Sequence, residues 1–236
     1  MTAARDRAIV EQHLIPTYPS LEPQLRISTN KKKRDRIAFS NGQIESIDTF
    51  SFTPAMRADT LKLLQDEHCA NLRDLTLRDV AVEDLAMFSH LVALEKLRFT
   101  WAKLDKVTTL APLAKLRNLQ VLDVRRAPVA DLAPLKKLPL KKLTISGTQV
   151  ANLKPLAKHP TLECLEADGT LVADVRPLFS CKKLCNVSVW DARVPGAEAQ
   201  ALVGAIKANR AKPSRGADYN RYVSHNTADW YAKKAP

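Results

Sequence analysis

The stretch LQVLDVRRAPVADLAPLKKL (residues 119–138) contains the pattern that decides the fold. Within a unit that begins at Leu119, apolar residues stand at positions 1, 4, 6 and 11. The same pattern begins again at five other leucines, with offsets of 22, 25, 21, 22 and 22 residues along the series: Leu72, Leu94, Leu140, Leu162 and Leu184. A constant period in the twenties predicts a solenoid in which each unit stacks on the next.

Each unit is expected to contain one short strand and one short helical turn. Positions 4 and 6 alternate with positions 3, 5 and 7, so the second set should face solvent. The strand is followed by Asp-Leu-x-Pro-Leu at 131–135 and, with Val for the first Leu, at 174–178. The aspartate can accept free backbone N–H groups of a turn, and the proline prevents a longer helix. Stacked units of this kind share one continuous core.

The pattern resembles the leucine-rich-repeat family, and its return segment is similar to that of the internalin-like and phosphatase-regulator-like subclass. The resemblance covers residues 72–194 and implies an α/β, right-handed, horseshoe-shaped solenoid with parallel strands on the concave face. The chain departs from the family at position 9, where the family usually has Asn. Here that position holds Val80, Ala102, Ala127, Thr148, Thr170 and Ala192.

The segments around the repeats differ in character. Residues 1–36 are predicted to form an irregular basic leader, because Pro16, Pro19 and Pro23 interrupt any helix. Residues 195–210 are predicted to form a C-terminal cap helix, and residues 211–236 a basic tail rich in aromatic residues.

Residues 37–71 are predicted to contain an N-terminal hairpin and a degenerate first repeat with a helix. The dipeptide at 41–42 is Asn-Gly, which fits a tight hairpin turn. Ile47, Phe50 and Phe52 reproduce positions 1, 4 and 6 of the repeat, and Pro54 is expected to begin a helix that ends at about His68.

Composition restricts the class of protein. The 236 residues contain no apolar run long enough to cross a membrane, and residues 1–7 lack the apolar segment of a secretory signal. Four cysteines in a chain of this length do not indicate a disulfide scaffold. We therefore expect a cytoplasmic protein that is monomeric in isolation. The net charge of +12 indicates attraction to polyanions but does not specify a fold.

The sequence indicates no catalytic residues, no cofactor and no metal site. None of the six glycines stands in a phosphate-binding motif, and no Gly-x-Ser-x-Gly nucleophile motif occurs. His159 and Cys181 share position 20 on the convex side, whereas Cys164 and Cys185 stand on the strand side. One tetrahedral zinc ion could not reach both pairs. We therefore predict a non-enzymatic protein.

The predicted concave face carries its charge unevenly. The second to fourth units contribute mainly basic residues and the last two mainly acidic ones, and two tryptophans stand at positions 7 and 8. A face of mixed sign suits a protein partner better than a polyanion. The predicted partner-binding residues are Arg98, Trp101, Arg125, Arg126, Lys142, Glu166, Asp168 and Trp190.

Two other functions remain open. The basic run and the basic tail could bind nucleic acid, the run through Lys31, Lys32, Lys33, Arg34 and Arg36. Alternatively, the run is only a solvated leader. The second of these functions is that of a structural subunit in a larger assembly, in which the ends of the chain become ordered only against neighbouring subunits.

Overall fold

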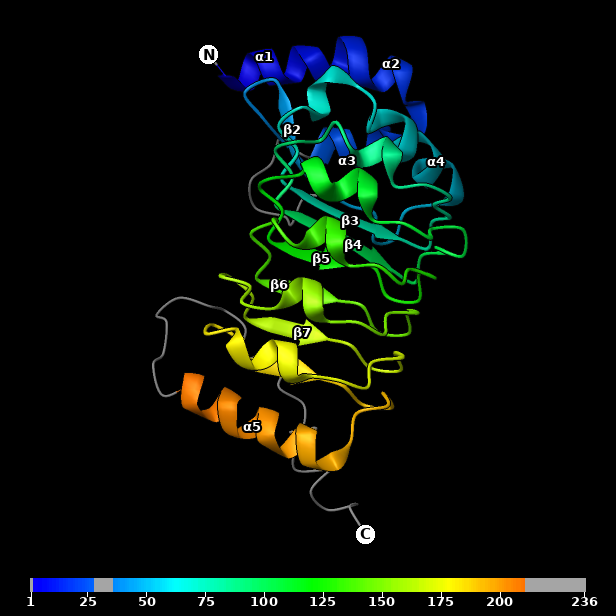
Figure 1. The fold of residues 1–236 in the computed structure, drawn as a ribbon. Helices are drawn as coiled ribbons and strands as arrows, with labels where there is room; N and C mark the ends of the chain where they lie inside the picture. Colours follow the sequence, from blue (N-terminus) through cyan, green and yellow to red (C-terminus); the bar gives the residue numbers. More distant parts are fainter. Residues whose placement is uncertain (1, 28–35, 211–236) are drawn as a thin grey trace.

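The computed structural model describes residues 2–27 and 36–210 of the chain. Eight strands form one sheet in sequence order, and they stack along the length of the molecule (Figure 1). The first pair, β1 (Ile37–Ser40) and β2 (Gln43–Asp48), is antiparallel, and every later pair is parallel. The later strands are β3 (Asp74–Arg78), β4 (Lys96–Thr100), β5 (Val121–Asp123), β6 (Lys142–Thr144), β7 (Cys164–Glu166) and β8 (Asn186–Ser188).

From β2 to β8, one short 3₁₀ helix lies between each strand and the next, on the side opposite the strands. In two of these turns the predicted aspartate accepts the hydrogen bond: Ala133 donates its N–H to Asp131 Oδ1 at 2.8 Å, and Arg176 donates to Asp174 Oδ1 at 2.9 Å. The predicted role of these aspartates is thereby confirmed. The helices are η3 (Glu67–Cys69), η4 (Ala86–Phe88), η5 (Ala111–Lys115), η6 (Ala133–Leu135), η7 (Lys154–Leu156) and η8 (Arg176–Ser180).

The predicted register of the six repeats is confirmed by strand pairing and burial. Leu122 pairs with Leu143, and Leu143 with Leu165, so position 4 of one unit lies beside position 4 of the next. All three side chains are fully buried in one continuous apolar core. At position 9, the Thr148 and Thr170 hydroxyls donate to main-chain carbonyls of their own units at 2.7 Å. Burial of the apolar side chains at position 4 of successive units stabilises the stack.

In each of the six repeats, the residue at position 8, one to three residues after the end of the strand, has positive φ. Gly147 (φ 72°) and Gly169 (φ 60°) adopt this backbone conformation without a steric cost. For a residue with a Cβ, the same conformation is less favourable by about 1–2 kcal/mol. The non-glycine residues at this position are Asp79, Trp101, Arg126 and Asp191. The left-handed residue turns the chain sharply out of the sheet at the same point of every unit.

The predicted register of the first repeat is wrong by three residues. Ile47 pairs with Leu75 and therefore occupies position 4, not position 1, which makes Ile44 the start of this unit. Thr49 then fills the core position 6, fully buried, with its Oγ1 accepting the Arg78 N–H at 2.7 Å. The register could not be predicted from the sequence because Thr49 is polar, whereas the other units have an apolar residue at position 6. Phe50 consequently moves from the core to the concave face, where it is 44% exposed.

The prediction of an irregular leader at 1–36 is wrong for residues 2–27, which form a series of short helices. Pro19 and Pro23 lie in the first turn of their own segments, where the missing N–H costs no helical hydrogen bond. Pro16 instead follows a π-helical turn within a continuous run of helical residues. Apolar side chains of this series, among them Leu14 and Leu21, are fully buried in the common core. The segments are α1 (Thr2–Ile9), the π-helical η1 (Val10–Leu14), α2 (Ile15–Thr17), η2 (Pro19–Leu21) and α3 (Glu22–Ile27).

Two longer helices complete the fold. Helix α4 (Pro54–Leu63) begins where the sequence predicts, with Thr53 Oγ1 accepting the Met56 N–H. It ends before His68 because Asp66 caps the separate turn η3. Helix α5 (Gly196–Arg210) lies across the far end of the solenoid, opposite α1 (Figure 1). Within the described residues, no helix has the length and apolar character needed to cross a membrane.

Candidate interaction surface

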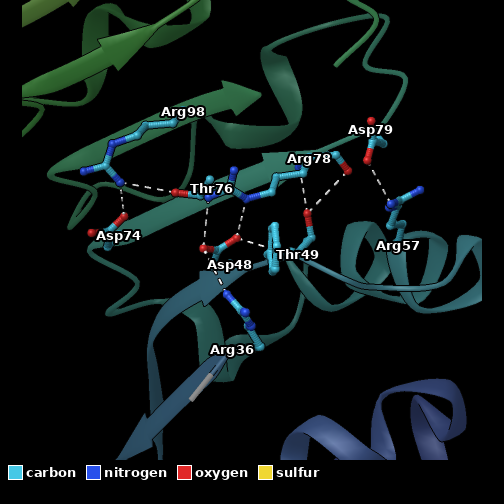
Figure 2. Close-up of polar contacts among 10 residues, drawn as sticks. Arg36, Asp48, Thr49, Arg57, Asp74, Thr76, Arg78, Asp79 and Arg98 are labelled. Atoms are coloured by element: carbon cyan, nitrogen blue, oxygen red, sulfur yellow. Dashed lines mark hydrogen bonds and ion pairs between the residues drawn. The ribbon is translucent and has the colours of Figure 1, made fainter. Parts of the chain in front are cut away.

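The concave face is covered by ion pairs that link neighbouring strands. Asp74 on β3 accepts hydrogen bonds from two residues of β4, Lys96 at 3.2 Å and Arg98 at 2.8 Å. Arg98 also donates to the Thr76 hydroxyl at 3.2 Å, so its guanidinium is directed toward β3 (Figure 2). Parallel strands lie about 4.8 Å apart, which brings position 3 of one unit within reach of positions 3 and 5 of the next.

A second group of paired charges lies at the N-terminal end of this face. Asp48 accepts Arg78 Nε–H at 2.8 Å and lies 3.6 Å from the Arg36 guanidinium (Figure 2). Burial alone would raise the pKa of Asp48, but hydrogen bonds and the two arginines outweigh burial and lower it. The Arg36 and Arg78 guanidinium carbons lie 4.5 and 5.3 Å from the centre of the Phe50 ring. Two guanidinium groups therefore make cation–π contacts with the Phe50 ring.

The middle of the face contains a network around Glu166. Lys142 lies 2.5 Å from Glu166 Oε1, and Arg125 lies 3.8 Å from Oε2 and 2.8 Å from Asp123. Hydrogen bonding to Asp123 raises the pKa of Arg125. Burial would lower the pKa of Lys142, but Glu166 outweighs burial and raises it. The basic middle expected from the sequence is thus offset by carboxylates on its own and adjacent strands.

Asp168 and Gly147 determine the local packing at the C-terminal end of the face. Asp168 Oδ1 accepts hydrogen bonds from the Ser188 hydroxyl and, at 2.7 Å, from the Trp190 N–H. A Cβ at Gly147 would meet the Arg126 side chain at 3.4 Å, so the Arg126 stem lies directly over this glycine. The segment of chain beside Trp190 is held in place, and the indole itself remains 51% exposed.

Three exposed aromatic residues lie along one border of the sheet. Phe50, Trp101 and Trp190 follow the carboxyl ends of β2, β4 and β8 and are 44%, 69% and 51% exposed. Because these strands are parallel, their carboxyl ends share one border. We call these three residues the aromatic edge. At about 4.8 Å per strand, Trp101 lies roughly 10 Å from Phe50 and roughly 19 Å from Trp190 along the stack.

Comparison with known proteins identifies the repeats. The human leucine-rich repeat-containing protein 56 is 32% identical over 138 residues, which are 56% of this chain and 24% of that protein. A leucine-rich-repeat protein of Leptospira interrogans matches 78% of this chain and 50% of its own, with a TM-score of 0.52 at 16% identity. The chain has the leucine-rich-repeat fold.

The repeats are also similar to those of an internalin. An internalin C2 of Listeria monocytogenes is 30% identical over 52% of this chain and 54% of that chain, with a TM-score of 0.49. No protein-family model matches. The chain spans about a quarter of the length of its human relative, as the 24% coverage shows. The α/β solenoid architecture predicted from the repeat is confirmed.

The leucine-rich-repeat structure brings together some predicted site residues and separates others. Arg125, Lys142 and Glu166 form one network, whereas Arg98 interacts with Asp74 instead. Of the basic run, only Arg36 belongs to the described residues; Lys31, Lys32, Lys33, Arg34 and the tail at 211–236 lie outside them.

Sequence reasoning missed three features of the structure. Phe50 was assigned to the core because its spacing imitates the repeat, and only the strand register places it on the aromatic edge. His13 and His68 lie far apart in the sequence, yet their ring centres are 5.1 Å apart. No signal in the sequence links two residues that are 55 positions apart in unrelated segments. Cys164, expected at the surface, is 8% exposed, and burial raises the pKa of its thiol to about 11.

Proposed function

We propose that this chain is a non-enzymatic interaction protein that binds another protein on its concave face. The observation that carries the proposal is the aromatic edge, in which two tryptophans and Phe50 are exposed along one border of the sheet. Tryptophan is enriched among residues that dominate binding energy at protein interfaces. The binding residues in this proposal are Phe50, Arg98, Trp101, Arg125, Arg126, Lys142, Glu166, Asp168 and Trp190.

The charge arrangement supports a protein partner over a nucleic acid. A nucleic acid requires unpaired cations that neutralise phosphates. On this face, Arg98, Arg125 and Lys142 are each paired with a carboxylate of the chain itself. Polar groups that satisfy one another leave the aromatic side chains as the main apolar contact area. The partner is therefore expected to present apolar side chains to the aromatic edge and a polar surface of mixed sign to the strands.

We propose a cytoplasmic protein that is monomeric in isolation. Cys69 and Cys164 are free thiols in the core, as is usual for proteins of a reducing compartment. Burial raises the pKa of Cys69 to about 12, so this thiol acts as a packed apolar group and not as a nucleophile.

The test measures binding kinetics of single variants. The partner is recovered from native lysate with the wild-type chain, and its association and dissociation are then measured by surface plasmon resonance. Trp190→Ala is expected to raise the dissociation rate at least tenfold, equivalent to about 1.4 kcal/mol or more of binding free energy. Trp101→Ala is expected to act in the same direction.

Phe179 provides a matched control. It is an aromatic residue of similar exposure, 41%, but it lies in η8 on the convex side. Phe179→Ala is expected to leave the kinetics unchanged. If both tryptophan variants bind like wild type, or if Phe179→Ala alone weakens binding, the concave face is not the binding site.

A second measurement addresses the nucleic-acid alternative. Binding to duplex DNA is measured across a series of salt concentrations. A steep loss of affinity with salt that disappears when Lys31, Lys32 and Lys33 are changed to Gln would favour nucleic-acid binding through the basic run. Weak DNA binding that these changes do not alter is the result expected for a protein-binding chain.

A further inference from the structure

The N-terminal helices meet the first repeat at a cluster of histidine and carboxylate side chains. His13 belongs to η1, and Asp66 caps η3, the turn that contains His68. His13 Nε2 lies 3.3 Å from Asp66 Oδ2, and His68 Nδ1 lies 2.6 Å from Asp66 Oδ1. One ligand atom from each of the three residues lies within 4.8 Å of the others. Two segments more than 50 positions apart thus direct three potential ligands at one point.

We propose that His13, Asp66 and His68 bind a divalent zinc ion that fastens the N-terminal helices to the first repeat. Imidazole nitrogen and carboxylate oxygen are both zinc ligands, at about 2.0–2.2 Å. Ligand atoms at that distance in a tetrahedral site are separated by about 3.3 Å. The separation of His13 Nε2 and Asp66 Oδ2 already has this value, 3.3 Å. The His68 ligand atom lies within 4.8 Å of the other two, and its ring would exchange its 2.6 Å contact with Asp66 Oδ1 for the ion.

The electrostatics of the cluster keep the carboxylate ready for a cation. The Asp66 side chain is only 8% exposed, and burial alone would raise its pKa. Hydrogen bonds from the His68 N–H, the His68 ring, Tyr18 and His13 outweigh burial and lower that pKa. Binding of a metal ion would replace the contacts that the Asp66 carboxylate makes with the two imidazole rings.

Tyr18 supplies a supporting interaction outside the three ligands. Its hydroxyl donates to Asp66 Oδ2 at 3.0 Å. Burial, followed by the hydrogen bond to Asp66, raises the pKa of Tyr18 to about 12, so it remains a donor. Hydrogen bonds of this kind orient metal-binding carboxylates and commonly improve affinity by 10- to 100-fold.

The cluster is accessible from one side. The His13 side chain is 49% exposed, whereas those of Asp66 and His68 are 8% and 12% exposed. An ion can therefore enter past His13, and a water molecule can occupy the fourth tetrahedral position on that side. Because the ion would bind the folded chain and not the unfolded one, it would stabilise the N-terminal helices by a free energy that rises with the logarithm of the free zinc concentration once that concentration exceeds the dissociation constant.

The test uses the full chain after treatment with a chelator and desalting. Zinc chloride is titrated in by calorimetry, and cobalt chloride by visible absorption, with thermal unfolding measured in parallel. Wild-type protein is expected to bind one ion per chain and to unfold at a higher temperature with zinc. His13→Ala is expected to weaken binding at least tenfold, and His68→Ala to weaken it similarly. Since His13 is half exposed, its variant is expected to fold even if the His68 variant does not.

His90→Ala is the matched control. His90 lies on the neighbouring repeat, where its Nε2 contacts the Leu64 carbonyl at 2.9 Å, and it belongs to no ligand set. This variant is expected to retain the zinc affinity of wild type. The proposal is overturned if zinc does not bind saturably, or if His13→Ala binds it like wild type. A cobalt–thiolate absorption band that persists in His13→Ala would place the metal on cysteines and would overturn it equally.

Discussion

The middle repeats (residues 119–172) and the N-terminal cap (residues 2–27 and 36–64) both contain fully buried leucines, but only those of the repeats can be predicted from the period of the sequence. Leu122, Leu143 and Leu165 occupy one column, and each pairs with the next. Leu14 and Leu25 in the cap are just as fully buried, yet no column predicts them. A repeat reveals its core because each unit has a copy of itself as its neighbour. A cap has a unique neighbour on one side, so its contacts follow no period.

The largest expected effect tests whether the cap belongs to the same cooperative unit as the repeats. Leu143→Ala removes a fully buried side chain from the middle of the stack and should cost about 2–5 kcal/mol in free energy of unfolding. Leu14→Ala should have a cost in the same range if the cap and repeats unfold together. Urea unfolding measures both values.

Hydrogen exchange separates the two possible outcomes of that experiment. If Leu14→Ala lowers amide protection only in the N-terminal cap, the cap opens independently of the repeats. A surface control is Val92→Ala, because Val92 is 55% exposed and should change stability by less than about 0.5 kcal/mol. A similarly small effect of Leu143→Ala would contradict the repeat register.

An intermediate effect is expected at the turn that ends each strand. Gly147 has φ 72°, and a Cβ there would lie 3.4 Å from the Arg126 side chain. Gly147→Ala should therefore destabilise the protein by about 1–2 kcal/mol. The same substitution at Gly204, in α5 with no atom within 4 Å of the added Cβ, should stabilise it by about 0.5–1 kcal/mol. Equal effects at the two glycines, measured by thermal unfolding, would show that φ at position 8 is not the determining factor.

The smallest effect is confined to acidic conditions and concerns His159, at position 20 of the middle repeats. His159 is 3% exposed, neither ring nitrogen has a hydrogen-bond partner among the described residues, and burial lowers the pKa of the imidazole below 6.5. Below about pH 6.5 the unfolded chain therefore binds more protons than the folded one. The contribution of neutral His159 to the free energy of unfolding is fully present above that pH and is lost as the pH falls through the lowered pKa.

His159→Leu tests this dependence, because leucine occupies the same column at Leu91, Leu116 and Leu138. The variant should unfold at a higher urea concentration than wild type at acidic pH, with a smaller difference at pH 8. A stability curve that decreases just as steeply in acid as that of wild type would assign the dependence to other groups.

Much of the solenoid could be predicted from single residues and their spacing. The aspartates before η6 and η8 accept the turn N–H groups, as their position predicts. The buried leucines of residues 72–194 follow from the period, because stacked units place equal positions side by side. The first repeat could not be read in this way. Thr49 fills an apolar column there, and its hydroxyl is satisfied by the next strand, a contact that only the folded sheet provides.

The site depended still more on the tertiary structure. The sequence identified Trp101 and Trp190 as exposed, because their positions in the unit determine which way they point. It did not reveal that Lys142 and Arg125 share Glu166, since side-chain pairing depends on rotamers and strand spacing. It also did not reveal the cluster of His13, Asp66 and His68. Periodicity specifies contacts between equivalent residues of adjacent units, whereas contacts between unlike segments are decided only when the whole chain packs.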